Sequence, residues 1–245
     1  MNGARSQVLE VAELDFVVAA QRWAFAEAEA ERVAAHWASL RKAKPSLFNG
    51  RILLLGRHKL ERRLDGAMKL SGAYFETDYA NFLAWRDFGF PDRMVANAFS
   101  MAALRGADGA FLLGEMAAHT ANAGRIYFPA GTPDAKDVFD GRVDLEASAT
   151  RELIEETGVD GSETRFGPGW SVVYAPPRIA CLKIMRLAEP AEAVKARVDA
   201  FLAADPEAEL AATHVVRRAE DIDERRTPPF VADFLRFAFA QRSAG

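Results

Sequence analysis

The chain has 245 residues, half of them apolar, and its 31 basic and 35 acidic residues give a formal net charge of -4. That length suffices for one large domain or two small ones, and without a basic excess nothing indicates nonspecific nucleic-acid binding. The single cysteine, Cys181, excludes an internal disulfide and a multi-cysteine zinc site and suits a reducing compartment. No stretch approaches the roughly 20 apolar residues of a membrane span, and the opening MNGARSQVLEVAELDF lacks the basic start and apolar core of a signal peptide. A cytoplasmic protein without a membrane or nucleic-acid partner is expected.

The first 95 residues predict a smaller α+β unit. Residues 8–18 indicate a strand, and residues 19–44, rich in Ala and Glu, indicate one long amphipathic helix. Residues 51–70 alternate and break like a two-stranded hairpin. Residues 76–89 predict a short aromatic-rich helix that stops at Gly89. A domain boundary is expected near residue 95.

The remaining part, residues 96–245, interleaves predicted strands and helices. The predicted strands lie within residues 97–116, 125–134, 171–187 and 212–222, and the predicted helices within residues 145–157, 190–206 and 228–242. Hairpins outnumber strand-helix-strand units, which favours a mixed sheet packed between helices. The sequence therefore predicts an α+β fold for the chain.

The stretch RELIEETGV, Arg151–Val159, carries the strongest chemical signal. Asp144 can cap a helix that starts at Leu145, and Gly158 is a natural left-handed terminator. On that helix, Glu152, Glu155 and Glu156 are spaced i, i+3 and i+4 and are expected to project from one face. Their mutual repulsion, a few tenths of a kcal/mol per pair, would be reversed by a hard divalent cation such as Mg²⁺. The alternative is a solvated acidic helix face.

The order of residues in RELIEETGV resembles the core of the Nudix box of Nudix hydrolases, and FPAG, residues 128–131, is similar to the entry into the Nudix loop. The resemblance covers roughly residue 96 to the C-terminus. It implies a Nudix-type α/β/α sandwich with a mixed sheet, preceded here by the N-terminal α+β unit.

The upstream loop departs from the family pattern, which has a Gly fourteen residues and a Glu eight residues before the Arg. Those positions hold Asp137 and Val143. If Gly131 is the first glycine instead, the loop carries an insertion, and its Glu is missing or replaced by Asp144 or Glu146. Arg151, expected to hold the loop through a bidentate ion pair, then lacks its usual partner.

The resemblance implies divalent-metal-dependent hydrolysis of a phosphoanhydride bond in a nucleoside diphosphate linked to another moiety. Mg²⁺ or Mn²⁺ would bridge Glu152, Glu155 and Glu156 to the diphosphate and acidify bound water. Glu155 or Glu156 could also act as general base. Glu207 and Glu209, from a region where family members often recruit a carboxylate, are further candidates, although a carboxylate of this kind is more often a surface charge.

The N-terminal unit loosely resembles that of UDP-glucose-type Nudix pyrophosphatases, which implies a nucleotide sugar as substrate. Arg51, Tyr74 and Tyr79, together with Gly131 of the loop, are then expected at the substrate, and Asn49 beside them. Alternatively, the aromatic residues of this unit simply form its core. The basic segment RHKLERR, Arg57–Arg63, could face a diphosphate or form a polar hairpin.

Two other functions remain open. One is a coenzyme A diphosphatase, because longer Nudix loops with inserts occur there too. The other is a non-catalytic Nudix-fold protein that binds a nucleotide-derived small molecule; the missing loop Glu favours it, and the three-carboxylate helix argues against it. Nudix proteins often dimerise, so a homodimer is compatible with each reading.

Overall fold

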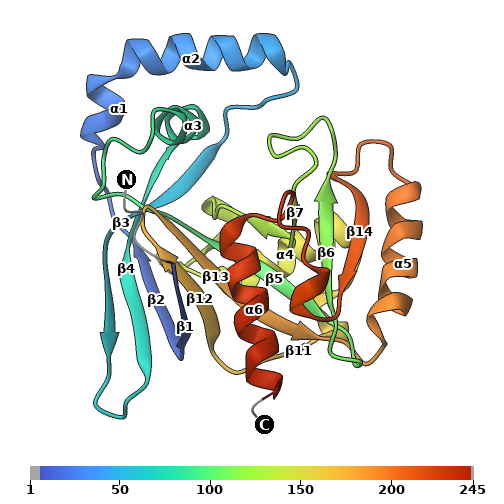
Figure 1. The fold of residues 1–245 in the computed structure, drawn as a ribbon. Helices are drawn as coiled ribbons and strands as arrows, with labels where there is room; N and C mark the ends of the chain where they lie inside the picture. The colour runs from blue at the N-terminus through green and yellow to red at the C-terminus, as the bar shows by residue number, and fades with distance from the viewer. Residues whose placement is uncertain (1–5, 244–245) are drawn as a thin grey trace.

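The computed structural model describes residues 6–243. The start of the N-terminal segment considered above as a signal peptide, residues 1–5, lies outside the described residues. Two mixed sheets with flanking helices give the α+β fold that the sequence predicts (Figure 1). The helices are α1 (Ala24–Ala28), α2 (Ala30–Ala43), α3 (Tyr79–Asp87), α4 (Leu145–Thr157), α5 (Ala191–Ala203) and α6 (Pro229–Ser243). Across residues 6–243, no helix has both the length and the apolar character needed to cross a membrane.

The larger sheet has the strand order β1-β12-β13-β5-β6-β14, with three short strands attached at its sides. Its strands are β1 (Gln7–Val11), β5 (Asn97–Arg105), β6 (Phe111–Met116), β7 (Ile126–Tyr127), β8 (Ala130–Gly131), β11 (Arg165–Phe166), β12 (Trp170–Ala175), β13 (Arg178–Arg186) and β14 (Leu210–Val216). β13 and β5 run parallel, and the other pairs are antiparallel.

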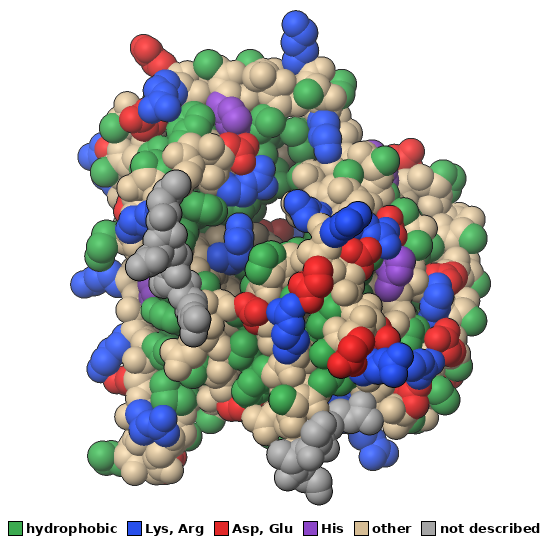
Figure 2. Space-filling view, viewed as in Figure 1, with side chains coloured by type: hydrophobic (Ala, Val, Ile, Leu, Met, Phe, Trp, Pro, Cys, Tyr) green, Lys and Arg blue, Asp and Glu red, His purple; other side chains and the backbone are tan. Residues whose placement is uncertain are grey.

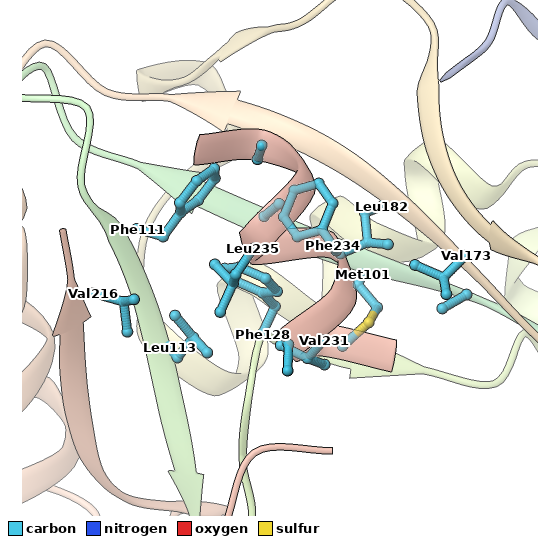
Figure 3. Close-up of a cluster of buried hydrophobic side chains, with 14 of the residues drawn as sticks. Met101, Phe111, Leu113, Phe128, Val173, Leu182, Val216, Val231, Phe234 and Leu235 are labelled. Carbon is cyan, nitrogen blue, oxygen red and sulfur yellow. The ribbon is translucent and has the colours of Figure 1, made fainter. Parts of the chain in front are cut away.

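Helices cover both faces of this sheet, as a sandwich requires. Phe234 of α6 packs against Phe111 and Phe128 on one face (Figure 3). On the other face, Leu153 of α4 and Val198 of α5 are fully buried in a second apolar cluster. The mixed sheet between helices that was predicted for residues 96–245 is therefore present.

The smaller sheet has the strand order β3-β4-β2-β10-β9. Its strands are β2 (Glu13–Val18), β3 (Arg51–Arg62), β4 (Met68–Asp78), β9 (Val138–Phe139) and β10 (Arg142–Val143). β3 and β4 form a hairpin, as predicted for residues 51–70. β4 continues to Asp78, however, so that the helix predicted over residues 76–89 begins only at Tyr79. Residues 8–18, predicted as one strand, instead break at Ala12, so that β1 joins the larger sheet and β2 the smaller one. β9 and β10, which follow residue 95, also join the smaller sheet. Strand pairing therefore crosses residue 95 in both directions. The domain boundary expected there stays a prediction.

The helix predicted over residues 19–44 is shorter and interrupted. α1 starts only at Ala24, and Glu29, with φ -106° and ψ 15°, separates it from α2. Trp23 and Phe25, at the start of α1, are buried and pack in one cluster with Phe75 and Trp85 of the β4–α3 segment. Burial of these aromatic rings accounts for the departure from a continuous helix.

The larger sheet opens between β5 and β6. These strands pair at Arg105 and Phe111; further along, β8 pairs with β5 while β7 pairs with β6. The segment of residues 126–131 therefore lies in the opening. This opening brings the backbone of residues 130–131 against α4.

Candidate functional site

Helix α4 has the ends that the sequence predicts. The Asp144 side chain accepts hydrogen bonds from the N–H groups of Glu146 and Ala147, both at 2.9 Å. Gly158 ends the helix with φ 69°, the left-handed conformation that glycine adopts most readily. Leu153, fully buried, packs α4 against the larger sheet, so that the opposite side of the helix carries its polar side chains.

Glu152 and Glu156, one helical turn apart, line the same cleft. The Glu152 carboxylate lies against Gly131, where a Cβ atom would be 2.0 Å from Glu152 Oε1. Glu156 Oε1 accepts a hydrogen bond from the Ala130 N–H at 3.4 Å. Its Oε2 is buried without a hydrogen-bond partner in the described part of the chain. The two carboxylates are thus largely buried, and the negative charge of one disfavours ionisation of the other.

This environment penalises negative charge. Burial, opposed by the Arg151 charge, raises the pKa of Glu152 to about 7. Burial, together with the charges of Glu152 and Glu209, raises the pKa of Glu156 well above its ordinary value. Both shifts have the sign expected where desolvation and like charges disfavour ionisation. A cation between the two side chains would relieve both effects.

Glu155 differs from the expectation of a shared three-carboxylate face. Its side chain is 53% exposed and pairs with Arg151 at 3.1 Å. It lines a separate surface hollow beside Ile154 and Phe166, not the cleft that Glu152 and Glu156 line. Consecutive helical residues are about 100° apart around the axis, which carries Glu155 away from Glu156, and the Arg151 guanidinium holds it there.

Arg151 has the loop-anchoring ion pair expected of it, with an unexpected partner. Its Nη2 donates to both carboxylate oxygens of Asp137, at 3.1 and 3.3 Å, and its Nε donates to Asp137 Oδ1 at 3.3 Å. Asp137 is 1% exposed and also accepts from the Asp134 N–H. Burial opposes the charge of Arg151, but Asp137 and then Glu152 keep its pKa above the ordinary value. In the sequence, Asp137 stood out only because it occupies a position where the family pattern has Gly.

The two other candidates for the loop carboxylate have different partners. Asp144 caps α4, and Glu146 pairs with Lys183 at 2.6 Å. Neither contacts Arg151 among the bonds of the described residues. Asp137 therefore does the anchoring that was in doubt.

The cleft has a volume of about 720 Å³ and lies between the segment of residues 46–86 and the larger sheet. Figure 2 shows the molecule hollowed between these two parts. Its N-terminal lining is Ser46, Leu47, Phe48, Ile52, Tyr79, Phe82 and Arg86. The Lys44 ammonium donates to the Thr120 carbonyl and ties the loop after α2 to the loop before β7. Glu207 and Glu209 line the same cleft as Glu152, so the late carboxylates suggested as bases do reach it.

The residues expected at the substrate divide between cleft and core. Tyr79 and Gly131 line the cleft. Tyr74 does not: it is fully buried, and its hydroxyl donates to the Ala98 carbonyl at 3.0 Å. Arg51 lies outside the lining and pairs with Glu76 and Asp78 at 2.9 and 2.8 Å. Packing and local charge pairing explain both departures.

Two further segments that were considered have structural partners. Asn49 Oδ1 accepts from the Ala80 N–H at 2.8 Å and fixes the start of α3. In RHKLERR, Arg62 donates to the Gly66 carbonyl and Arg63 to Glu13, each at 2.9 Å. This segment forms one side of the polar hairpin and does not line the cleft. The hairpin alternative is the one that fits.

The acidic pair fits a hard dication without forming a complete cage. Within residues 6–243, no group of three or more His, Cys, Asp or Glu side chains is arranged to hold a metal ion. Mg²⁺ commonly takes only one or two protein carboxylates and fills its remaining positions with water and substrate phosphates. The buried, unpartnered Glu156 Oε2 and the space that Gly131 leaves for Glu152 are suited to that kind of site.

No family model matches the sequence, and a search of curated proteins finds no match. Among solved structures, the chain is similar to a MutT protein from Methanosarcina mazei Go1, with TM-score 0.42, 19% identity, and coverage of 60% of this chain and 95% of that one. It is similar to the Nudix hydrolase RenU from M. smegmatis, with TM-score 0.41, 16% identity, and coverage of 60% and 86%. A NUDIX hydrolase from Nitrosomonas europaea gives TM-score 0.38, 13% identity, and coverage of 78% and 89%. Similarity of this extent identifies neither reaction nor substrate, which must be inferred from the side chains of the cleft.

Proposed function

We propose that this chain is a Nudix hydrolase that cleaves a phosphoanhydride bond in a nucleoside diphosphate linked to another moiety. The observation that carries the proposal is the pairing of Glu152 and Glu156, from the RELIEETGV helix, in a cleft between the two units. Mg²⁺ or Mn²⁺ is the proposed cofactor, with these two carboxylates as protein ligands. When bound, the cation would neutralise phosphate charge and lower the pKa of water.

The side chains around the pair supply the remaining functions. Gly131 leaves room for the Glu152 carboxylate. Arg151 and Asp137 fix the loop that leads into α4. Glu209, whose charge acts on Glu156, is the proposed acceptor of the proton from the attacking water, and Glu207 is the alternative. The water oxygen bonds to one phosphorus of the diphosphate. The bond between that phosphorus and the bridging oxygen breaks, and the bridging oxygen leaves with the second phosphate.

We further propose a nucleotide sugar as the substrate class. In support, the N-terminal unit that loosely resembles UDP-glucose-type pyrophosphatases does cover the cleft, and Tyr79 lines it. Arg51 and Tyr74 give this narrower proposal no support, because neither lines the cleft. The single cysteine is free and fully buried, and a chain without an internal disulfide suits the proposed cytoplasmic setting. We also propose a homodimer.

A substrate screen tests the proposal directly. UDP-sugars, ADP-ribose, NADH, dinucleoside polyphosphates and coenzyme A would be incubated with and without Mg²⁺ or Mn²⁺, and the phosphate-containing products identified. We expect cation-dependent cleavage that disappears in Glu156→Gln. Cleavage of coenzyme A alone would replace the sugar proposal by a coenzyme A diphosphatase. Tight binding of a nucleotide without any cleavage would mean that the chain is a ligand-binding protein and not a hydrolase.

A further inference from the structure

The cleft has a basic end as well as an acidic one. Arg86, from the last turn of α3, and Arg178, the first residue of β13, line the same cleft as Glu152 and Glu156. They come from the N-terminal unit and the larger sheet respectively. A ligand that spans the cleft would therefore meet carboxylates at one end and guanidinium groups at the other.

The Arg178 guanidinium contacts two aromatic rings and has no anionic partner among the described residues. Its guanidinium lies 5.6 Å from the centre of the Phe230 ring and 5.9 Å from that of Phe90. These rings hold the charge in place by cation–π contact. Within residues 6–243 the Arg178 side chain has no ion pair or hydrogen bond, and it remains accessible to solvent. All five of its N–H donors are free for a ligand.

Arg86 adds a second guanidinium to this end, with part of its charge offset by its ion pair with Asp87. Its Nε donates to Asp87 Oδ1 at 2.7 Å, which leaves its terminal nitrogens for other contacts. Loss of hydration in the cleft, followed by the charge of Arg86, lowers the pKa of Arg178. Two cations near one another favour an anion between them, and guanidinium groups match phosphate and carboxylate oxygens bidentately.

The strand β5 sets the separation between the two ends. Asn97, Phe99 and Met101 alternate along β5 and line the cleft. Asn97 is in register with Arg178, whereas Met101 is in register with Ala130, whose N–H contacts Glu156. Four residues of strand correspond to roughly 13 Å between these backbone positions. The contacts of Arg178 and those of Glu156 are thus made at different points along β5.

We propose that Arg178 and Arg86 bind a second anionic group of the substrate, a phosphate or carboxylate carried on the moiety away from the scissile diphosphate. The inference rests on the proposed function for its substrate but not for its binding site. It makes nucleotide derivatives with such a group better substrates than otherwise identical neutral ones. It also gives the N-terminal unit a part in substrate selection, because Arg86 belongs to α3.

Two matched substrate pairs test the preference and separate the two sources of charge. UDP-glucuronate and UDP-glucose differ by a carboxylate, and NADPH and NADH differ by a ribose phosphate. We expect the wild type to prefer the charged member of at least one pair through a lower KM, and Arg178→Gln to reduce that preference about tenfold. Arg86→Gln should act in the same direction. Equal kcat/KM within both pairs for the wild type would overturn the proposal.

A binding measurement without divalent cations separates this inference from the proposed hydrolysis. Calorimetric titration with inorganic phosphate should show weaker binding, by about tenfold, to Arg178→Gln than to the wild type. Arg93→Gln is the matched control, because Arg93 is exposed, donates among the described residues only to the Gly89 carbonyl, and does not line the cleft. Unchanged phosphate binding by folded Arg178→Gln and Arg86→Gln would refute the site even if the chain hydrolyses nucleotides. Weakened binding without any hydrolysis would retain the site and refute the reaction.

Discussion

The Glu152 carboxylate fills the space that a side chain at Gly131 would need: a Cβ there would lie 2.0 Å from Glu152 Oε1 and 2.4 Å from its Cδ. The glycine therefore allows a close approach between the loop and helix α4. Because the obstructing atoms are the far end of a flexible side chain, a larger residue at position 131 should move Glu152 more than it disturbs the fold.

We expect Gly131→Ala to lower cation-dependent turnover at least tenfold while costing only about 1–3 kcal/mol of unfolding free energy. Turnover and urea denaturation would be measured on the same preparation. Gly167→Ala is the matched control, since its Cβ would lie 3.4 Å from the Ile184 Cβ, an ordinary contact. A fully active Gly131→Ala would show that Glu152 need not occupy its observed position.

The Arg151–Asp137 pair should be important for stability. Asp137 is buried, so removing the guanidinium leaves a desolvated carboxylate, at a cost of about 3 kcal/mol or more. We expect Arg151→Ala to show this loss, and Arg151→Lys to recover only part of it, because Lys lacks the fork. The exposed pair Arg218–Asp221 is the comparison, with Arg218→Ala costing at most about 1 kcal/mol. Equal, small losses for both arginines would contradict the anchoring role.

Metal binding should be linked to pH. The raised pKa values of Glu152, to about 7, and of Glu156 mean that the folded, metal-free protein holds more protons than the unfolded chain above the ordinary Glu range. Its stability should therefore fall as pH rises from about 4.5 towards 7. A dication favours the ionised carboxylates, so the rise in Tm on adding Mg²⁺ should be larger at pH 8 than at pH 5. The same Mg²⁺ effect at both pH values would argue against these ligands.

Tyr74 and Tyr79 should respond in opposite ways to loss of the hydroxyl. Tyr74→Phe removes a buried hydrogen bond to Ala98, so we expect it to cost about 1 kcal/mol of stability without raising KM. Tyr79→Phe changes the cleft lining and should raise KM with little effect on Tm. Thermal denaturation and steady-state kinetics on the two variants decide this. A raised KM for Tyr74→Phe alone would mean that the core assignment is mistaken.

The parts of the structure that sequence predicted correctly depend on local interactions. The ends of α4 follow from Asp144 and Gly158, which act on the backbone within one turn. The joint position of Glu152 and Glu156 follows from i, i+4 spacing. β3 and β4 pair as a hairpin with a short connection, although residues 52–56 of β3 are continuously buried and do not alternate. Each of these features would be similar in many tertiary settings.

The departures depend on partners that are distant in sequence. The break at Ala12 arises because β1 and β2 pair with different sheets. Glu155 is drawn to Arg151, and Asp137 reaches Arg151 only through the fold of the loop around residues 134–144. Arg178 gave no signal in sequence, because its isolation between two aromatic rings is a tertiary property.

The most direct test compares conservative variants of the three box carboxylates for Mn²⁺ binding, by calorimetry, and for turnover. We expect Glu152→Gln and Glu156→Gln each to weaken Mn²⁺ binding and to cut turnover by orders of magnitude while remaining folded. Glu155→Gln, which loses a partner of Arg151 and no cleft carboxylate, should have a smaller effect. If folded Glu152→Gln and Glu156→Gln bind Mn²⁺ and turn over like the wild type, the cleft that these two residues line is not the metal-dependent site proposed for it.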